Sequence, residues 1–230
     1  MSPLTSCLDP DFNHSFRFLP TPAYQNHYGA IVPTPGDGRW GMAEGAEPGP
    51  DISFIDLKAR RRRIQGFIEL LKSPHLDTRW KAAEALGKVG DQTAVQPLID
   101  ALEDPFVEVS WLAAKSLGSI GDSRAVEPLL RAIQSGDHWL RIGAAVALGK
   151  MREPRAVEPI LALLQDKQRM VRKHAAWALG MIGDERALPS LEGLRDDPDE
   201  KVREAVDIAI KVIQMKSEAG KSEEAAASDE

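Results

Sequence analysis

Residues 171–184 read Val-Arg-Lys-His-Ala-Ala-Trp-Ala-Leu-Gly-Met-Ile-Gly-Asp, and this stretch decides the fold because the chain repeats it. Variants of its last seven residues end at Asp91, Asp122, Glu153 and Asp184, with an offset of 31 residues each time. A fifth, degenerate unit places Val202-Arg203 in the column of Val171-Arg172. A fixed period of this length predicts an array of stacked structural repeats.

Each repeat is predicted to form two helices, and no stretch of the repeats alternates with the period of a β-strand. The first helix, helix A, begins with Ala-Val-x-Pro-Leu or a close variant at residues 94–98, 125–129 and 156–160. Its proline fits the first turn of a helix, where a missing N–H costs nothing. The second helix, helix B, carries Val-Arg-x-x-Ala-Ala-x-Ala-Leu-Gly, and Gly90, Gly121 and Gly183 suit its C-terminal end. A two-helix unit cannot bury its apolar face alone, so we predict an all-α solenoid of about five such repeats.

Two columns of polar residues flank helix B. Side chains that suit an N-cap occupy one column: Ser73, Asp104, Ser135, Asp166 and Asp197. Proline follows three of them, at 74, 105 and 198, where it suits the first helical position. Arginine fills the other column at 79, 141, 172 and 203, interrupted by Ser110. We expect these arginines to form a structural ladder with Asp104, Asp166 and Asp197.

The composition divides the chain into three parts. Residues 1–50 hold eight of the 16 prolines and six of the 13 aromatic residues, which predicts an irregular, Pro/Gly-rich N-terminal extension. Two interpretations stand for it: a segment that docks through its aromatic residues, or sequence upstream of a true start at Met42. Residues 51–216 form the predicted solenoid, and residues 217–230 form a predicted disordered acidic tail.

Charge and hydropathy exclude several classes of function. The net charge is −6, but residues 51–216 carry 25 acids and 26 bases, which disfavours nucleic acid as a partner. The arginines at 60–63 would spread around the whole circumference of a helix, so we interpret them as a solvated face. No apolar run is long enough to cross a membrane, and no secretory signal opens the chain. Cys7 is the only cysteine. We therefore expect a cytoplasmic protein.

Catalytic motifs are missing from the sequence. It contains neither a Gly-x-Ser-x-Gly nucleophile elbow nor a Walker loop, and the repeated glycines are explained by helix ends. A lone cysteine excludes a cysteine-based zinc site. We predict no catalytic residue, no metal site and no cofactor.

A stripe of large side chains is predicted on the outer side of the B helices. If the Ala-Leu pairs face the core, positions spaced by four residues between them face solvent. The predicted partner-binding stripe consists of Trp80, Trp111, Lys115, Ile142, Val146, Lys150, Trp177 and Met181. Exposed tryptophans are typical of binding surfaces, so we predict a protein or peptide partner. In the competing interpretation, the tryptophans pack between neighbouring repeats as core.

The signature at residues 171–184 resembles the HEAT-like repeats of the phycobilisome-lyase family, which includes the E/F-type bilin lyases. The resemblance covers roughly residues 64–213 and implies a right-handed solenoid whose B helices line the concave surface. It also implies a second function, a bilin lyase subunit or a chaperone that handles bilins or phycobiliproteins. Deoxyhypusine hydroxylases share this type of repeat, but they bind iron through His-Glu pairs, and none of the five histidines here precedes a glutamate.

Overall fold

The computed structural model describes residues 31–33, 40–42 and 54–228 of the chain, with side chains described from 57 to 219. The described strands belong to one compact unit, and the chain from Phe54 onward forms another. Strands β1 (Ile31–Pro33) and β2 (Trp40–Met42) pair antiparallel, with Val32 opposite Gly41. This hairpin is a local exception to the irregular extension predicted for residues 1–50, and Pro33 is tolerated because it ends its strand. Cys7 lies outside the described residues.

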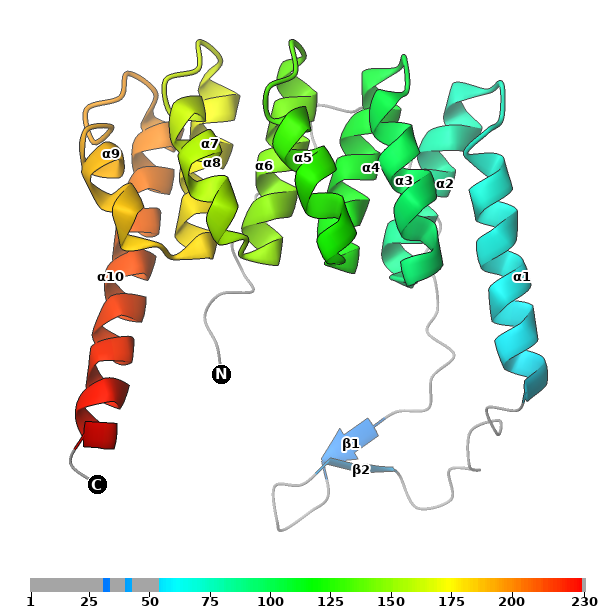
Figure 1. Ribbon diagram of the computed structural model, residues 1–230, viewed down its shortest axis with the longest axis horizontal. Helices are drawn as coiled ribbons and strands as arrows, with labels where there is room; N and C mark the ends of the chain where they lie inside the picture. Colours follow the sequence, from blue (N-terminus) through cyan, green and yellow to red (C-terminus); the bar gives the residue numbers. More distant parts are fainter. Residues whose placement is uncertain (1–30, 34–39, 43–53, 229–230) are drawn as a thin grey trace. The chain divides into compact units, whose positions relative to one another are not determined.

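The second unit is an all-α solenoid of five helix pairs, as predicted, and Figure 1 shows the pairs in a single row. The A helices are α1 (Phe54–Leu70), α3 (Val95–Asp100), α5 (Val126–Ala132), α7 (Val157–Leu163) and α9 (Leu188–Glu192). The B helices are α2 (Leu76–Val89), α4 (Val107–Ile120), α6 (His138–Met151), α8 (Arg169–Ile182) and α10 (Glu200–Ser228). Helices α3, α5, α7 and α9 lie in front of the B helices in the view of Figure 1, so the solenoid has two layers.

Short 3₁₀ helices join the layers. Four of them lead into an A helix: η3 (Gln92–Ala94), η5 (Ser123–Ala125), η6 (Pro154–Ala156) and η7 (Glu185–Ala187). Another, η4 (Ala101–Glu103), extends α3. The carboxylate that ends each repeat signature caps the 3₁₀ helix that follows it; Asp122, for example, accepts a hydrogen bond from the Arg124 backbone N at 2.9 Å.

The core runs through the whole row because every repeat contributes the same positions. In the B helices the leucine column is fully buried: Leu86, Leu117, Leu148 and Leu179 are each 0 % exposed. In the A helices Leu98, Leu129, Ile160 and Leu191 are buried to the same extent. One continuous apolar core therefore replaces the separate cores that single repeats could not build.

Neighbouring B helices approach each other at backbone distance. The glycines of one column, Gly87, Gly118, Gly149 and Gly180, each face a small residue of the next B helix: Ser116, Ala147, Ala178 and Ala209. A methyl group added to Gly149 would lie 2.8 Å from the Ala178 Cα, so no side chain fits between α6 and α8. In α10 the same column holds Lys211, whose side chain is exposed, and a further helix could not approach α10 as closely.

The predicted arginine ladder is confirmed for three of its four arginines; the fourth, Arg203, donates to the carbonyl oxygen of Asp197. The Nε atoms of Arg79, Arg141 and Arg172 donate to Oδ2 of Asp104, Asp166 and Asp197 at 2.7, 2.9 and 2.7 Å. Each arginine also donates through Nη1 to the carbonyl oxygen six residues before it. The hydrogen bonds from Arg172 lower the pKa of Asp197. These rungs tie the turn between two helices of one repeat to the turn of the next.

The predicted caps of the B helices are displaced by two residues. Asp104 Oδ1 accepts a hydrogen bond from the backbone N of Phe106 at 2.9 Å, and Asp166 Oδ1 accepts one from Gln168 N at 2.8 Å. These residues shape the turn, while the N-cap position falls on Phe106 or Gln168. The prolines at 74, 105 and 198 consequently lie in the turn. Ser73 and Ser135 bind the backbone N two residues on in the same way, so every one of these side chains shapes the turn whether or not an arginine holds it.

The C-terminal ends of the B helices test two further predictions, the glycine caps and the disordered tail. Gly90, Gly121 and Gly183 adopt the left-handed conformation expected of them, and in the third repeat Arg152 adopts it with φ 52°. At the other end, α10 continues to Ser228, so residues 217–228 are helical where a disordered tail was predicted. Alanine and glutamate make up seven of these twelve residues, and these strong helix formers extend a helix that packing has already nucleated.

The close contact between B helices predicts opposite effects for two glycine-to-alanine substitutions. A methyl group at Gly118 would lie 2.7 Å from the Ala147 Cβ, whereas nothing lies within 4 Å of one at Gly66 in α1. We expect Gly118→Ala to cost ~1–3 kcal/mol because α4 and α6 must separate. Gly66→Ala should gain up to ~1 kcal/mol from helix propensity. Thermal unfolding followed by circular dichroism compares the two; equal midpoints would contradict the contact.

Candidate interaction surface

The predicted stripe lies on α2, α4, α6 and α8 in three rows, and we call it the B-face stripe. Of its eight residues, Lys150 is exposed and six are half-buried: Trp80, Trp111, Lys115, Val146, Trp177 and Met181. Ile142 is 0 % exposed, so the prediction that it faces solvent is wrong. Ile142 shares its row with Trp80 and Trp111, and a shorter side chain at such a position ends below the surface.

The sequence left open whether the tryptophans of the stripe face solvent or pack as core, and in the structure each of them does both in part. Trp80, Trp111 and Trp177 pack against the continuous core, and each keeps part of its surface accessible. Trp111 is the clearest case. A methyl group added to Gly143 in α6 would lie 3.0 Å from Trp111 Cδ1 and 3.1 Å from the Trp111 carbonyl oxygen. The indole of α4 therefore occupies the space that glycine leaves on α6.

Two further contacts orient aromatic rings near the N-terminal ends of the B helices. Trp80 Nε1 donates to Asp77 Oδ1 at 3.4 Å, and the Lys81 ammonium lies 5.7 Å from the centre of the Trp80 ring. Trp139 lies outside the stripe, one turn before Ile142, and its ring centre is 5.1 Å from that of His138. Trp139 is half-buried like the stripe tryptophans, which makes it a matched reference for them.

Lysines surround the centre of the stripe. The Lys115 ammonium lies 5.4 Å from the centre of the Trp111 ring. Burial lowers the pKa of Lys115 below its ordinary value of 10.5, and the charge of Lys150 lowers it further; Lys88 acts in the same direction and Glu84 opposes it. Glu84 is itself bound by Lys88 at 2.8 Å. This part of the surface is cationic and partly desolvated.

The rows continue onto α10, which the prediction missed. Ile208 follows Lys115, Val146 and Trp177 in their row and is 49 % exposed; Val212 follows Lys150 and Met181 and is half-buried. One turn further, Met215 is 69 % exposed. The 31-residue period carried one step further would have found Ile208 and Val212, because each lies 31 residues after a stripe residue.

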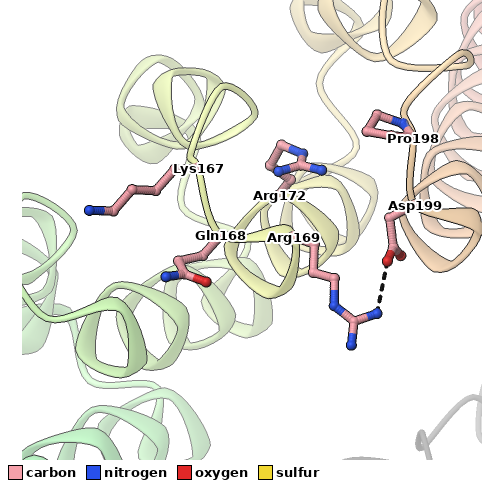
Figure 2. Close-up of a pocket in the computed structure, with 6 residues that line it drawn as sticks. All are labelled: Lys167, Gln168, Arg169, Arg172, Pro198 and Asp199. Atoms are coloured by element: carbon pink, nitrogen blue, oxygen red, sulfur yellow. Dashed lines mark hydrogen bonds and ion pairs between the residues drawn. The ribbon is translucent and has the colours of Figure 1, made fainter.

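A shallow depression of about 390 Å³ lies elsewhere, between the start of α8 and the turn before α10. Figure 2 shows its lining residues, with Arg169 turned toward Asp199. Arg169 Nη1 donates to Asp199 Oδ2 at 2.8 Å, and Arg172 is held by Asp197. The arginines of the depression are thus used for contacts between repeats. Within residues 54–219, no group of three or more histidine, cysteine, aspartate or glutamate side chains is placed to hold a metal ion.

Comparison with protein families identifies the repeats. The match to HEAT repeats covers residues 64–146 and 126–211. This chain belongs to the HEAT repeat family. The resemblance noted at residues 171–184 is also confirmed: the complex of CpcE and CpcF of phycocyanin lyase from Nostoc sp. PCC7120 matches with a TM-score of 0.61 and 26% identity, over 76% of this chain and 70% of that chain.

A second structure shares the fold alone. A designed armadillo repeat protein in complex with the peptide (KR)4 matches this HEAT repeat chain with a TM-score of 0.52 and 20% identity, over 69% of this chain and 85% of that one. A search of curated proteins found no match. Among the described helices, none is long and apolar enough to cross a membrane.

The packing of Trp111 against Gly143 predicts a local effect of substitution at Gly143. The side chain of Gly143→Val would overlap the indole, so we expect Trp111 to move off α6 and stability to fall by ~1–3 kcal/mol. In a ¹H–¹⁵N spectrum the Trp111 indole N–H signal, assigned with Trp111→Phe, should shift far more than the other indole signals. Gly66→Val, at an open position of α1, is the control. An unmoved Trp111 signal would show that the ring does not rest on Gly143.

Proposed function

We propose that this HEAT repeat solenoid is a non-catalytic scaffold that binds a protein or peptide over the B helices. The observation that carries the proposal is the B-face stripe, in which three tryptophans, Val146 and Met181 keep part of their surface accessible across four helices. Ile208, exposed on α10, extends the apolar surface to a fifth helix. Contiguous apolar surface of this extent on a folded protein marks an interaction site, and tryptophan is enriched among residues that dominate binding energy.

The packing of the two layers supports a concave binding surface. Neighbouring B helices touch at glycine and alanine, and a two-layer stack bends toward the layer whose members are closer together. The B helices would then form the inner side of the curve. A partner lying along an inner surface can contact several repeats at once, which raises the area buried for a given length of partner.

The fold likeness to designed armadillo repeat proteins supports the same type of partner. One of these proteins was solved in complex with a peptide, so stacked helical repeats of this kind can accommodate a peptide. The peptide of that complex is itself basic, (KR)4, whereas the stripe of this protein carries lysines beside the tryptophans. The partner of this solenoid is therefore expected to differ in sequence from the peptide of that complex.

Substitution of the outer tryptophans tests the proposal. We expect Trp80→Ala combined with Trp177→Ala to weaken partner binding about thirtyfold or more, because each indole contributes a binding hot spot. Trp111 is left intact, since its contact with Gly143 would mix binding with stability. Partners captured from the native cell by immobilised protein are identified, purified and titrated against the variants. Trp139→Ala, which removes a half-buried indole outside the stripe, should bind normally; equal loss in both variants would contradict the proposal.

A second candidate function rests on the likeness to the phycocyanin lyase complex, at 26% identity. This function is that of a bilin lyase subunit, or of a chaperone for bilins or phycobiliproteins. A linear tetrapyrrole combines an apolar ring system with two propionates. The half-buried Trp111 beside Lys115 offers an apolar face and a cation at the same place. The two candidate functions thus use the same surface and differ in the ligand.

Direct titration separates the candidates. If the stripe holds a bilin, phycocyanobilin mixed with the purified protein should show a shifted absorbance band that saturates with protein. Trp111→Phe, which keeps a ring in place, should retain the shift, whereas Lys115→Met should reduce it because a propionate loses its cation. An absorbance spectrum identical to that of free phycocyanobilin would remove this second function and leave the protein scaffold untouched.

A further inference from the structure

The arginine ladder has one incomplete position, at Arg203 in α10. Arg203 Nη1 donates to the carbonyl oxygen of Asp197, six residues before it, at 2.7 Å. The same contact anchors Arg172 on the carbonyl oxygen of Asp166, and Arg172 Nε and Nη2 then bind an aspartate of the next repeat. Within the described part of the chain α10 is the last helix, at one end of the row in Figure 1, so Arg203 has no such aspartate.

Arginine and aspartate occur together in the other rungs of the ladder. The arginines at 79, 141 and 172 each bind an aspartate 25 residues further on. In the second repeat Ser110 replaces the arginine, and the residue 25 positions further on is Ser135. Inside the solenoid an arginine is therefore present where a carboxylate meets it, and both are missing at the same rung. Arg203 departs from this pattern.

The contact with the turn does not account for Arg203. In the second repeat Ser110 Oγ donates to the carbonyl oxygen of Val107 at 3.2 Å, and α4 begins there without an arginine on the preceding turn. A B helix can therefore start without this anchor. The anchor of Arg203 leaves Nε and Nη2 on the side where, for the other arginines, the next repeat lies. These are the two donors that a carboxylate binds.

We propose that Arg203 is a docking site for an aspartate in a helix-start turn of a partner protein, separate from the B-face stripe. The rungs show the chemistry of the ligand. Asp197 accepts hydrogen bonds from Arg172 through both carboxylate oxygens, at 2.7 and 2.9 Å. Its Oδ1 also accepts one from the backbone N of Asp199 at 2.9 Å. A turn of this type holds the carboxylate ready for a bidentate, charge-assisted contact with a guanidinium group.

The partner contacts the turn end of α10 without continuing the solenoid. Lys211 occupies the column in which Gly180 of α8 faces Ala209, and its exposed side chain prevents a further helix from packing as closely. The apolar interface between repeats thus ends at α10. Arg203, near the start of the same helix, keeps the polar contact of that interface.

A second copy of this chain does not supply the aspartate. In its first repeat the matching column holds Ser73, which has no carboxylate. The aspartates of that column, Asp104, Asp166 and Asp197, already bind arginines of their own chain. The occupant is therefore a different protein that carries an aspartate in a turn of this type.

The arginine Nε–H signals in a ¹H–¹⁵N spectrum of the full chain test the site directly. The signals of Arg79, Arg141 and Arg172 should exchange slowly with water, because their Nε–H groups are bonded to aspartate. The Arg203 signal, assigned with Arg203→Lys, should exchange rapidly in the free protein. A slowly exchanging Arg203 signal in the free protein would overturn the inference, because the chain itself would then complete the rung.

The ligand probe is a peptide that copies one of the turns of this protein. The peptide is residues 102–110, Leu-Glu-Asp-Pro-Phe-Val-Glu-Val-Ser, blocked at both ends. At millimolar concentration it should shift the Arg203 Nε–H signal and slow its exchange. The same peptide with asparagine in place of Asp104 should bind about tenfold more weakly or less, because it loses the charge-assisted pair.

Two arginine variants separate the guanidinium group from its charge. Arg203→Lys keeps the charge and a donor for the Asp197 carbonyl oxygen, but it cannot bind a carboxylate in the bidentate manner, so peptide affinity should fall about tenfold. Arg195→Lys, at an exposed arginine between α9 and α10, should leave the affinity unchanged. If Arg203 serves only the turn, Arg203→Lys lowers the thermal midpoint and leaves peptide binding unaltered, which would contradict the proposal.

Other outcomes would also overturn the inference. These are equal binding of the aspartate and asparagine peptides, no shift of the Arg203 signal at millimolar peptide, and self-association of the chain that Arg203→Lys abolishes. The last result would assign the site to a second copy. The variant with Trp80→Ala and Trp177→Ala should bind the peptide normally, so this test does not depend on the scaffold function of the B-face stripe.

Discussion

Direct contact between the backbones of neighbouring B helices is the constraint on which the solenoid depends. Gly118 and Gly149 face Ala147 and Ala178 with no room for another carbon atom between the helices. This contact fixes the spacing and register of the B layer, so residues 31 positions apart fall into straight rows. The rows bring Trp80, Trp111 and Trp177 onto one surface. The B-face stripe therefore depends on the same close contact between neighbouring B helices, since Gly118 and Trp111 of α4 both face α6.

The arginine ladder fixes the register independently, at the other end of the B helices. Arg79, Arg141 and Arg172 each hold the next repeat through an aspartate, and all three side chains are largely shielded from solvent. Ser110 interrupts the ladder between the second and third repeats, at the helix that carries Trp111 and Lys115. Together, the glycine column and the ladder preorganise the stripe, so a partner meets side chains whose positions are already set.

Much of the architecture could be predicted from the sequence because each structural role recurs at one fixed period. The arginine ladder was predictable because the arginines of the first, third and fourth repeats each have an acid at the matching position of the next repeat. The burial of Ile142 was not predictable, because it depends on the length of this side chain compared with the tryptophans of its row. The shifted caps escaped prediction because serine and aspartate suit a turn, in which they bind the backbone N two residues on, as well as they suit an N-cap. The C-terminal end of α10 was not predictable from local composition, because residues 217–228 are helical as the continuation of a helix that is already packed on the core.

Positions that recur from repeat to repeat explain the fold, and positions that differ between repeats are those through which the proposed partner would be selected. In the first four repeats the leucine and glycine columns each hold one residue type, and the leucines are fully buried. The row of Lys115 instead holds Glu84, Val146, Trp177 and Ile208, a set that no packing requirement demands. Because the glycine column holds the backbones of the B helices, these side chains can vary from repeat to repeat without disturbing the stack. That freedom is what the proposed binding surface requires.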